Sequence, residues 1–351
     1  MPKRRLSHEP HVPMYQRILE SLAHDIQTGK YRPGQKFPSE ATLVRQFGSS
    51  RITVGRALNE LEHRGLVERR AGSGTYVRTR KTARATFGLL IPDFEATEIF
   101  EPICRGIAGA ASAKEYAFLW GQTSRQYVEM GVAGVFFAPL EESAEAHALN
   151  LEIIAQLEDA RIPVVLLDRC YMPYPCRSRH DLVGIDNWRA GFIATEHLVK
   201  AGATRIAFLG HARGAQTIDA RLSGYRAALG ETPALIFRPE SIEPRTIEQF
   251  HKRSHPDAYV CANDRTAGEL MRALISAGQR IPGDVRIVGI DDVEYASLLP
   301  VPLTTVRQPC REIGEAALGA MLDRMARPNS LPRDILIECR LVVRESCGSK
   351  A

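Results

Sequence analysis

The sequence has no apolar run near the ~20 residues that a transmembrane helix requires, and we therefore expect no membrane-spanning segment. Its first residues are basic, but no apolar stretch follows them, so we expect no secretory signal. The seven cysteines are odd in number, and no two of them form a CxxC pair. These absences predict a cytoplasmic protein with free thiols, no structural metal and no cofactor.

Sequence motifs of common enzyme classes are also missing. The chain contains no GxSxG, HExxH, GxGxxG or phosphate-binding P-loop pattern. The histidines His180, His197 and His211 are scattered and have no evident carboxylate or nucleophile partner in the sequence. We therefore expect a protein that is not an enzyme.

The charge of the chain is unevenly distributed. At ~150 residues per domain, the 351 residues suggest two or three domains. Residues 1–84 hold 17 Lys and Arg and 7 Asp and Glu, a balance of +10, whereas residues 85–351 hold 29 and 34, a balance of −5. Such asymmetry favours a polyanion partner for the N-terminal part, with a basic surface that has no partner as the alternative.

Three amphipathic segments and a glycine-rich hairpin are predicted in the first 78 residues. Apolar residues recur at helical spacing between residues 15 and 26. Further helices are predicted over 39–47 and over 51–64, each opened by a serine that can cap it. Two β-rich runs then flank a glycine-rich turn, which indicates a wing. Two helices joined by a short turn are typical of proteins that place the second helix in the DNA major groove.

The segments VPMYQRILESLAHDIQTGKYRPGQKFPSE and GSSRITVGRALNELEHRGLVERRAGSGTYV resemble the DNA-binding domain of the GntR family. The resemblance implies a winged helix-turn-helix domain over 1–78 that binds double-stranded operator DNA. It implies DNA contacts from Ser39, Glu40, Ser50, Arg51, Thr53, Gly72, Ser73 and Gly74.

One position departs from the pattern of the GntR family. The family usually places an arginine after Thr-Val, whereas this chain has Gly55 followed by Arg56. Either Arg56 supplies the DNA contact from a rotated position, or the operator differs there. Two alternatives also remain for neighbouring residues: Glu40 is only a first-turn residue favoured by the helix dipole, or Arg51 is a solvated helix end.

The rest of the chain has the pattern of an α/β protein. Residues 79–85 are polar and without periodicity, so we expect a linker there. From 86 to 351, apolar runs alternate with helical stretches, which predicts parallel sheets covered on both faces. The pattern restarts near residue 182, which favours two subdomains with a cleft between them. The stretches 121–131 and 229–256 are short, which indicates either trimmed elements or residues missing from the sequence.

Several segments of this second part resemble the effector domain of the LacI/GalR family, which is similar to periplasmic sugar-binding proteins. They include IPVVLLDR, RLSGYRAAL, DAYVCAND and VRIVGIDDVEYASLLPVPLTTVRQP. The resemblance implies a two-subdomain domain over 86–351 that binds a small effector and dimerises. A GntR-type domain joined to this type of effector domain resembles the AraR-like subgroup of carbohydrate-responsive repressors.

Six polar residues at motif positions form a candidate effector set: Asp168, Arg169, Arg221, Asn263, Asp291 and Gln308. Sugars need fixed hydrogen-bond partners for their hydroxyls, and carboxylates, Arg and Asn supply these. The resemblance places the set in the ligand cleft. As alternatives, Asp168 and Asp291 are helix-cap or hinge carboxylates, and Arg221 forms a salt bridge. Arg169 either neutralises Asp168 or holds an anionic ligand.

The sequence thus predicts a DNA-binding repressor that acts as a homodimer and responds to a sugar or sugar derivative. The alternative is an orphan or purine-responsive regulator that uses its large domain mainly to dimerise. Asp264 and Asp292, which stand beside the candidate effector residues, are expected to be structural.

Overall fold

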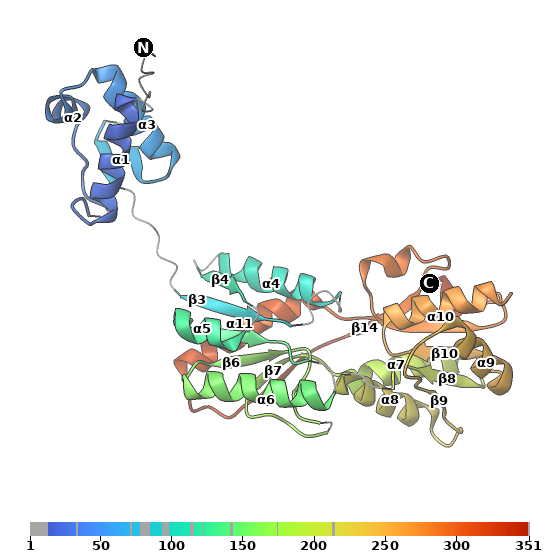
Figure 1. The fold of residues 1–351 in the computed structure, drawn as a ribbon. Coiled ribbons are helices and arrows are strands. Elements are labelled where there is room, and N and C mark those ends of the chain that lie inside the picture. The colour runs from blue at the N-terminus through green and yellow to red at the C-terminus, as the bar shows by residue number, and fades with distance from the viewer. Residues whose placement is uncertain are drawn as a thin grey trace, which may run out of the picture. The chain divides into compact units, whose positions relative to one another are not determined.

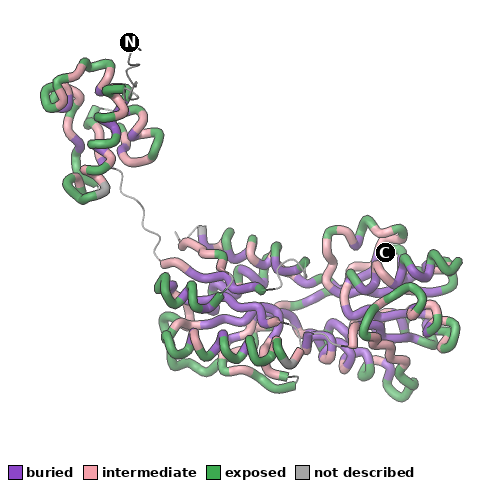
Figure 2. The backbone as a smooth tube through the Cα atoms, viewed as in Figure 1, coloured by how far each residue is buried: buried purple, intermediate pink, exposed green. Residues whose placement is uncertain are grey.

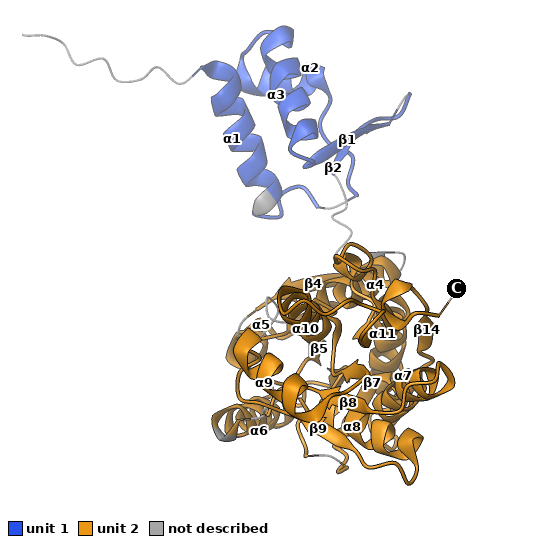
Figure 3. Cartoon of the chain, turned by 90° about the vertical axis from the view of Figure 1, so that its right-hand side faces the viewer, with its two compact units in different colours: residues 1–82 blue, residues 83–351 orange. Residues whose placement is uncertain are grey.

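A computed structural model describes residues 13–32, 34–70, 72–77, 85–92, 98–112, 116–121, 123–140, 143–173, 175–212 and 215–349. The chain divides into two compact units, residues 1–82 and 83–351 (Figure 3). The predicted linker over 79–85 lies outside the described residues except for its last residue, Ala85.

Unit 1 is a three-helix unit with a two-stranded antiparallel hairpin (Figure 1). Its elements are α1 (Met14–Gln27), α2 (Glu40–Phe47), α3 (Arg51–His63), β1 (Val67–Arg70) and β2 (Gly74–Val77). Leu22, Leu43, Val54 and Leu61 are completely buried and bring all three helices onto one core. The predicted winged helix-turn-helix is therefore confirmed.

Local sequence signals set the turn between α2 and α3. The Ser39 Oγ accepts a hydrogen bond from the Thr42 amide, and the Ser50 Oγ accepts one from the Thr53 amide, both at 3.2 Å. Gly48 ends α2 with φ +58°, a left-handed conformation that glycine adopts without strain. The two caps fix where each helix begins, and with that the residues that α3 presents to solvent.

Unit 2 contains two six-stranded sheets, each covered by helices on both faces (Figure 1). The first sheet has the strand order β13-β7-β6-β5-β3-β4, and all its neighbouring strands are parallel. Its strands are β3 (Thr86–Leu90), β4 (Ala117–Trp120), β5 (Gly134–Phe137), β6 (Val164–Leu167), β7 (Asp181–Ile185) and β13 (Asp334–Ile337). Its helices are α4 (Phe100–Ser112), α5 (Ser124–Met130), α6 (Ala144–Asp159) and α11 (Cys310–Ala326).

The second sheet has the order β14-β12-β11-β10-β8-β9, and only its edge strand β14 is antiparallel. Its strands are β8 (Ile206–Leu209), β9 (Leu235–Phe237), β10 (Ala258–Cys261), β11 (Arg286–Asp291), β12 (Thr304–Arg307) and β14 (Arg340–Val342). Its helices are α7 (Asn187–Lys200), α8 (Gln216–Leu229), α9 (Pro244–Ser254) and α10 (Asp264–Ser276), with the short helices η1 (Glu294–Ser297) and η2 (Glu345–Cys347) nearby.

The central strands of both sheets consist of buried residues (Figure 2), and alternate side chains along them pack on opposite faces of each sheet. On β5, Phe136 packs on the face covered by α4 and α11, whereas Val135 and Phe137 pack on the face covered by α5 and α6. Burial on both faces explains why these strands are continuous apolar runs in the sequence. The predicted fold class, parallel α/β in two subdomains, is confirmed.

The chain passes between the two sheets three times, after β7, after β12 and after β13. The restart of the pattern near residue 182 does not mark the subdomain boundary, because β7 still pairs with β6 of the first sheet. The crossing comes after Ile185. Each subdomain is therefore assembled from separate parts of the chain, which strand and helix patterns alone do not reveal.

The two short stretches contain complete elements. The stretch 121–131 holds α5, a seven-residue helix that is enough to carry the chain from β4 past β3 to β5. Residues 229–256 hold the three-residue strand β9 and the helix α9.

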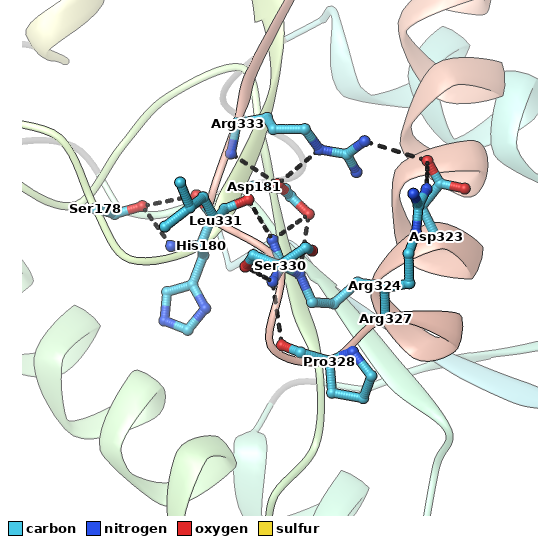
Figure 4. Close-up of polar contacts among 10 residues, drawn as sticks. All are labelled: Ser178, His180, Asp181, Asp323, Arg324, Arg327, Pro328, Ser330, Leu331 and Arg333. Carbon is cyan, nitrogen blue, oxygen red and sulfur yellow. Dashed lines mark hydrogen bonds and ion pairs between the residues drawn. The ribbon is translucent and has the colours of Figure 1, made fainter.

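A buried carboxylate ties β13 and α11 to β7 (Figure 4). Asp181 is completely buried and forms ion pairs with Arg324 at 2.9 Å and with Arg333 at 3.3 Å. It also accepts a hydrogen bond from the Arg333 amide at 2.8 Å. The Arg324 guanidinium donates to the backbone oxygen of Ser330 as well, at 2.5 Å. The second chain segment of the first subdomain is thus tied to β7 between the end of α11 and the start of β13.

Candidate DNA-binding surface and effector cleft

An arginine-rich surface surrounds the start of α3. The Arg51 side chain is 84% exposed, and its Nε lies 3.3 Å from Glu40 Oε2. The other Glu40 oxygen lies 3.9 Å from Arg69 of β1. Glu40 therefore lies between two arginines from different elements, and its position is more than that of a first-turn residue. Exposed ion pairs of this kind contribute about 0–1 kcal/mol to stability. They therefore orient the arginines but leave them able to bind another anion.

The remaining residues predicted for DNA contact have different surroundings. The Arg56 guanidinium stacks on the Tyr15 ring of α1 at 4.0 Å from its centre. The Thr53 Oγ1 lies 2.8 Å from the Ser50 Oγ. Ser39, Ser50 and Thr53 thus all take part in helix capping, whereas Arg51 and Arg56 extend from exposed positions on α3.

The tip of the hairpin is shaped by glycine. Gly72 has φ +72° and Gly74 has φ +115°, values that other residues rarely adopt. The Ser73 Oγ lies 2.7 Å from the Tyr76 hydroxyl, and the Arg70 guanidinium stacks on the Tyr76 ring at 4.4 Å. The hairpin therefore presents a narrow backbone turn with a cationic side chain beside it.

In unit 2, two candidate effector residues occupy equivalent places in the two sheets. Asp168 directly follows β6, and Asp291 ends β11, the strand at the same position in the other sheet. Both have positive φ, +65° and +133°, although neither is glycine. Backbone conformations of this type cost of order 1–3 kcal/mol and persist where the surroundings enforce them, often at functional sites.

Arg221 of α8 connects the second subdomain's polar residues. Its side chain is 5% exposed and lies 3.3 Å from Asp291 Oδ1. It also donates to Asn187 Oδ1 at 2.8 Å and to the Ala262 backbone oxygen at 2.5 Å. Gln308 donates to Asp291 Oδ1 at 2.6 Å. The predicted salt bridge of Arg221 is therefore present, and it positions Asp291 within the second subdomain.

Two buried side-chain oxygens among the described residues accept no hydrogen bond: Asp168 Oδ1 and Gln308 Oε1. The other Asp168 oxygen lies 3.3 Å from Arg169 Nε, and the Arg169 guanidinium lies over the Phe100 ring at 5.2 Å. Buried polar atoms without partners are costly, and in a ligand site they mark where a bound molecule donates hydrogen bonds.

Cavities open onto these residues. One of about 380 Å³ is lined by Asp168, Arg169 and Asn187 together with residues of α8 and β13. Another of about 680 Å³ is lined by Asp291, Gln308, Glu98 and Tyr295. Each is lined by residues of both subdomains, as a cleft between them requires.

Two neighbouring carboxyls, those of Asp291 and Asp264, have raised pKa values. Burial raises the pKa of Asp291, the Arg221 charge opposes this, and the charges of Asp168 and Glu98 raise the pKa further. Burial and the Asp291 charge also raise the pKa of Asp264. The Asp168 charge thus acts on the pKa of Asp291, although the two residues belong to different subdomains.

Asn263 caps a helix and lines neither of the two cavities. Its Oδ1 accepts a hydrogen bond from the Thr266 amide at 2.8 Å and so caps α10. Asp264 accepts from the Thr305 hydroxyl at 2.5 Å and from the Val293 amide at 3.1 Å. These contacts confirm that Asp264 is structural.

Asp292 forms ion pairs with Arg307 at 2.5 Å and with Arg344 at 2.6 Å. Its side chain is buried. Asp292 therefore joins β12 to the segment after β14, which confirms that it too is structural.

Sequence reasoning missed several residues of the cleft. Asn187 follows β7 in the segment GIDN and holds Arg221. Gln216 donates to the backbone oxygens of Cys170 and, at 2.7 Å, of Met172, which connects the subdomains. The Tyr295 hydroxyl makes a second connection, to Glu98 at 3.3 Å. Only Asn187 had a signal, a polar residue two positions after the end of an apolar strand.

No group of three metal-ligating side chains that could hold a metal ion occurs among the described residues. The seven cysteines are all within the described part and all free. No described helix has both the length and the apolarity needed to cross a membrane.

Two family models match the chain. Residues 14–77 match the model of bacterial regulatory proteins of the gntR family, and residues 195–347 match a periplasmic binding protein-like domain. The first match covers the helices and hairpin of unit 1, and the second covers most of the second subdomain, β13 and α11.

Known proteins are similar over almost the whole chain. An arabinose metabolism transcriptional repressor from Geobacillus stearothermophilus is 30% identical, over 96% of this chain and 98% of that protein. A protein of the same description from Halalkalibacterium halodurans is 26% identical, over 95% and 96%. Among solved structures, a LacI family transcriptional regulator from Enterococcus faecium with bound ribose has a TM-score of 0.62. It is 25% identical and covers 74% of this chain and 98% of its own.

Proposed function

Because the chain belongs to the GntR-type regulators that include the arabinose metabolism transcriptional repressors, we propose that it represses carbohydrate genes as a homodimer in the cytoplasm. It is a ligand-responsive regulator and not an enzyme. Unit 1 binds operator DNA, and a sugar in the cleft of unit 2 changes the affinity for that DNA. A two-fold dimer requires an operator with two half-sites in inverted orientation.

The observation that carries the effector proposal is the pair of buried oxygens without partners, Asp168 Oδ1 and Gln308 Oε1. Sugar hydroxyls are donors that satisfy such acceptors, and Arg221 is fixed at Asp291, whose Oδ1 also accepts from Gln308. The relatives named for arabinose and the structure with bound ribose favour a pentose as the effector.

On the DNA side, the caps at Ser39 and Ser50 orient α3, and Arg51 supplies an exposed guanidinium at its start. Arg51 is therefore proposed to contact a base or phosphate in the major groove. The glycines Gly72 and Gly74 let the hairpin backbone approach the DNA closely.

The three crossings of the chain between the two sheets couple effector binding to the affinity for DNA. A ligand that contacts Asp168 in one subdomain and Asp291 in the other favours the arrangement in which the two subdomains come together. An effector acts on DNA affinity only through its different affinity for two arrangements of the dimer. The expected consequence is that the sugar lowers operator affinity.

The first experiment is a thermal-shift panel of pentoses, hexoses, disaccharides, sugar phosphates and purines on the full chain. Stabilisation by one sugar, followed by loss of operator binding in its presence, supports the proposal. A purine as the sole stabilising ligand, or no ligand at all, contradicts the sugar assignment.

Two variants separate the two sites. Arg51→Ala is expected to weaken operator binding by tenfold or more, about 1.4 kcal/mol, without changing sugar affinity. Asp168→Asn is expected to weaken sugar binding and leave ligand-free operator affinity unchanged. Arg272→Ala and Asp284→Ala, at surface positions of unit 2, are the matched controls. If either Arg51→Ala or Asp168→Asn loses operator affinity and sugar affinity to the same extent, the two-site assignment is contradicted.

A further inference from the structure

The recognition helix α3 exposes a large apolar side chain. Ile52 is 86% exposed, the highest value for any large apolar side chain in the described residues. A β-branched residue has a low helix propensity, and a solvated isoleucine gains nothing from burial. The described part of unit 1 therefore gives no stabilising reason for isoleucine at this position.

The position of Ile52 on the helix is defined. With 3.6 residues per turn, Ile52 lies opposite Val54 and Leu58, whose side chains are in the core. It shares the outward face with Gly55 and Arg56, one turn later. A Cβ added at Gly55 would meet nothing within 4 Å, so the helix surface beside Ile52 is open at this position among the described residues.

The surroundings of Ile52 are cationic. Arg51 and Arg56 flank it on α3, and the first 84 residues have a net charge of +10. A polyanion complements this charge, whereas an apolar protein partner does not. Double-stranded DNA has an anionic backbone, and a thymine in its major groove offers an apolar group to Ile52.

We propose that Ile52 reads a thymine of the operator by packing against its 5-methyl group. The inference rests on the proposed binding of operator DNA by unit 1. Of the four bases, only thymine carries a methyl group at the major-groove edge. The N-terminal residues of a recognition helix contact base edges, and Ile52 is the second residue of α3.

The test begins with an operator that the full chain itself selects from a randomised duplex library. Each thymine of one half-site is then replaced by deoxyuridine, which removes only the methyl group, and binding is measured by fluorescence anisotropy. For the wild type, one replacement is expected to weaken binding by about fourfold, the effect of exposing one methyl-sized group.

The variants complete a double-mutant cycle. Ile52→Ala is expected to bind the thymine operator more weakly and to show no further loss with deoxyuridine at that position. Ile52→Val keeps part of the apolar surface and is expected to retain a reduced sensitivity. Leu298→Ala, at another highly exposed apolar residue, is the control and is expected to behave as wild type. Circular dichroism checks that α3 remains folded.

Two outcomes overturn the inference in distinguishable ways. If no deoxyuridine affects the wild type, or if Ile52→Ala loses as much as the wild type, Ile52 does not read a methyl group, while operator binding stands. If the selection enriches no sequence and all duplexes bind alike, the proposed operator binding fails as well.

Discussion

Replacing Arg221 with methionine is a direct test of the polar cluster in the cleft. The substitution keeps much of the side-chain volume but removes the charge paired with Asp291 and the donors to Asn187 and Ala262. Removing one partner of a buried ion pair costs about 3–5 kcal/mol, because the other charge remains buried. We expect a loss of this order in the free energy of unfolding of unit 2 at about pH 8.

The loss depends on pH in a defined direction. Burial already raises the pKa of Asp291 above its unfolded value, and removing Arg221 raises it further. A carboxyl with a raised folded-state pKa contributes stability that is complete below the unfolded pKa and is lost as pH rises through the folded pKa. The cost of Arg221→Met is therefore expected to shrink towards about pH 4.5, where Asp291 is largely protonated in the folded variant.

Tryptophan fluorescence during urea unfolding is a suitable assay, because both tryptophans, Trp120 and Trp188, lie in unit 2. The double variant Arg221→Met/Asp291→Asn is expected to be about 1–3 kcal/mol more stable than the sum of the single effects predicts. Arg272→Met, at the surface, is the control and should change stability by less than about 0.5 kcal/mol. A cost that is independent of pH and additive with Asp291→Asn would refute the reasoning, since it would mean that water reaches Asp291.

Three further substitutions test other parts of the structure. A Cβ on Gly224 would overlap the backbone oxygen of Trp188 where α7 and α8 cross, so Gly224→Ala is expected to destabilise unit 2 by about 1–3 kcal/mol; an unchanged urea midpoint would contradict the close crossing. Asp181→Asn weakens the buried ion pairs of Figure 4 and is expected to cost about 3–5 kcal/mol in the same assay, and a loss below about 1 kcal/mol would show that the pairs are solvated. Gly55→Ala is expected to stabilise unit 1 by about 1 kcal/mol, seen in its amide hydrogen exchange, with no change in the tryptophan transition.

Much of unit 1 follows from the sequence because its structure depends on short-range interactions. The serine caps act three residues along the chain, Gly48 ends α2 by its own backbone conformation, and the buried face of α3 repeats every three to four residues. The strands of unit 2 were equally visible, since burial on both faces requires uninterrupted apolar runs. The ends of these strands then indicated Asp168 and Asp291 as polar residues at one edge of each sheet.

Only the tertiary structure decided how these parts combine. The second segment of each subdomain includes a C-terminal strand, β13 or β14, and both strands are short and carry no long apolar run. The partners of Arg221 come from positions 34, 41 and 70 residues away, and no periodic pattern connects residues at such separations. Whether a polar oxygen is satisfied or left for a ligand depends on all neighbours at once. The sequence therefore determined which residue types stand at the cleft, and long-range packing determined which of them pair with each other and which remain open to an effector.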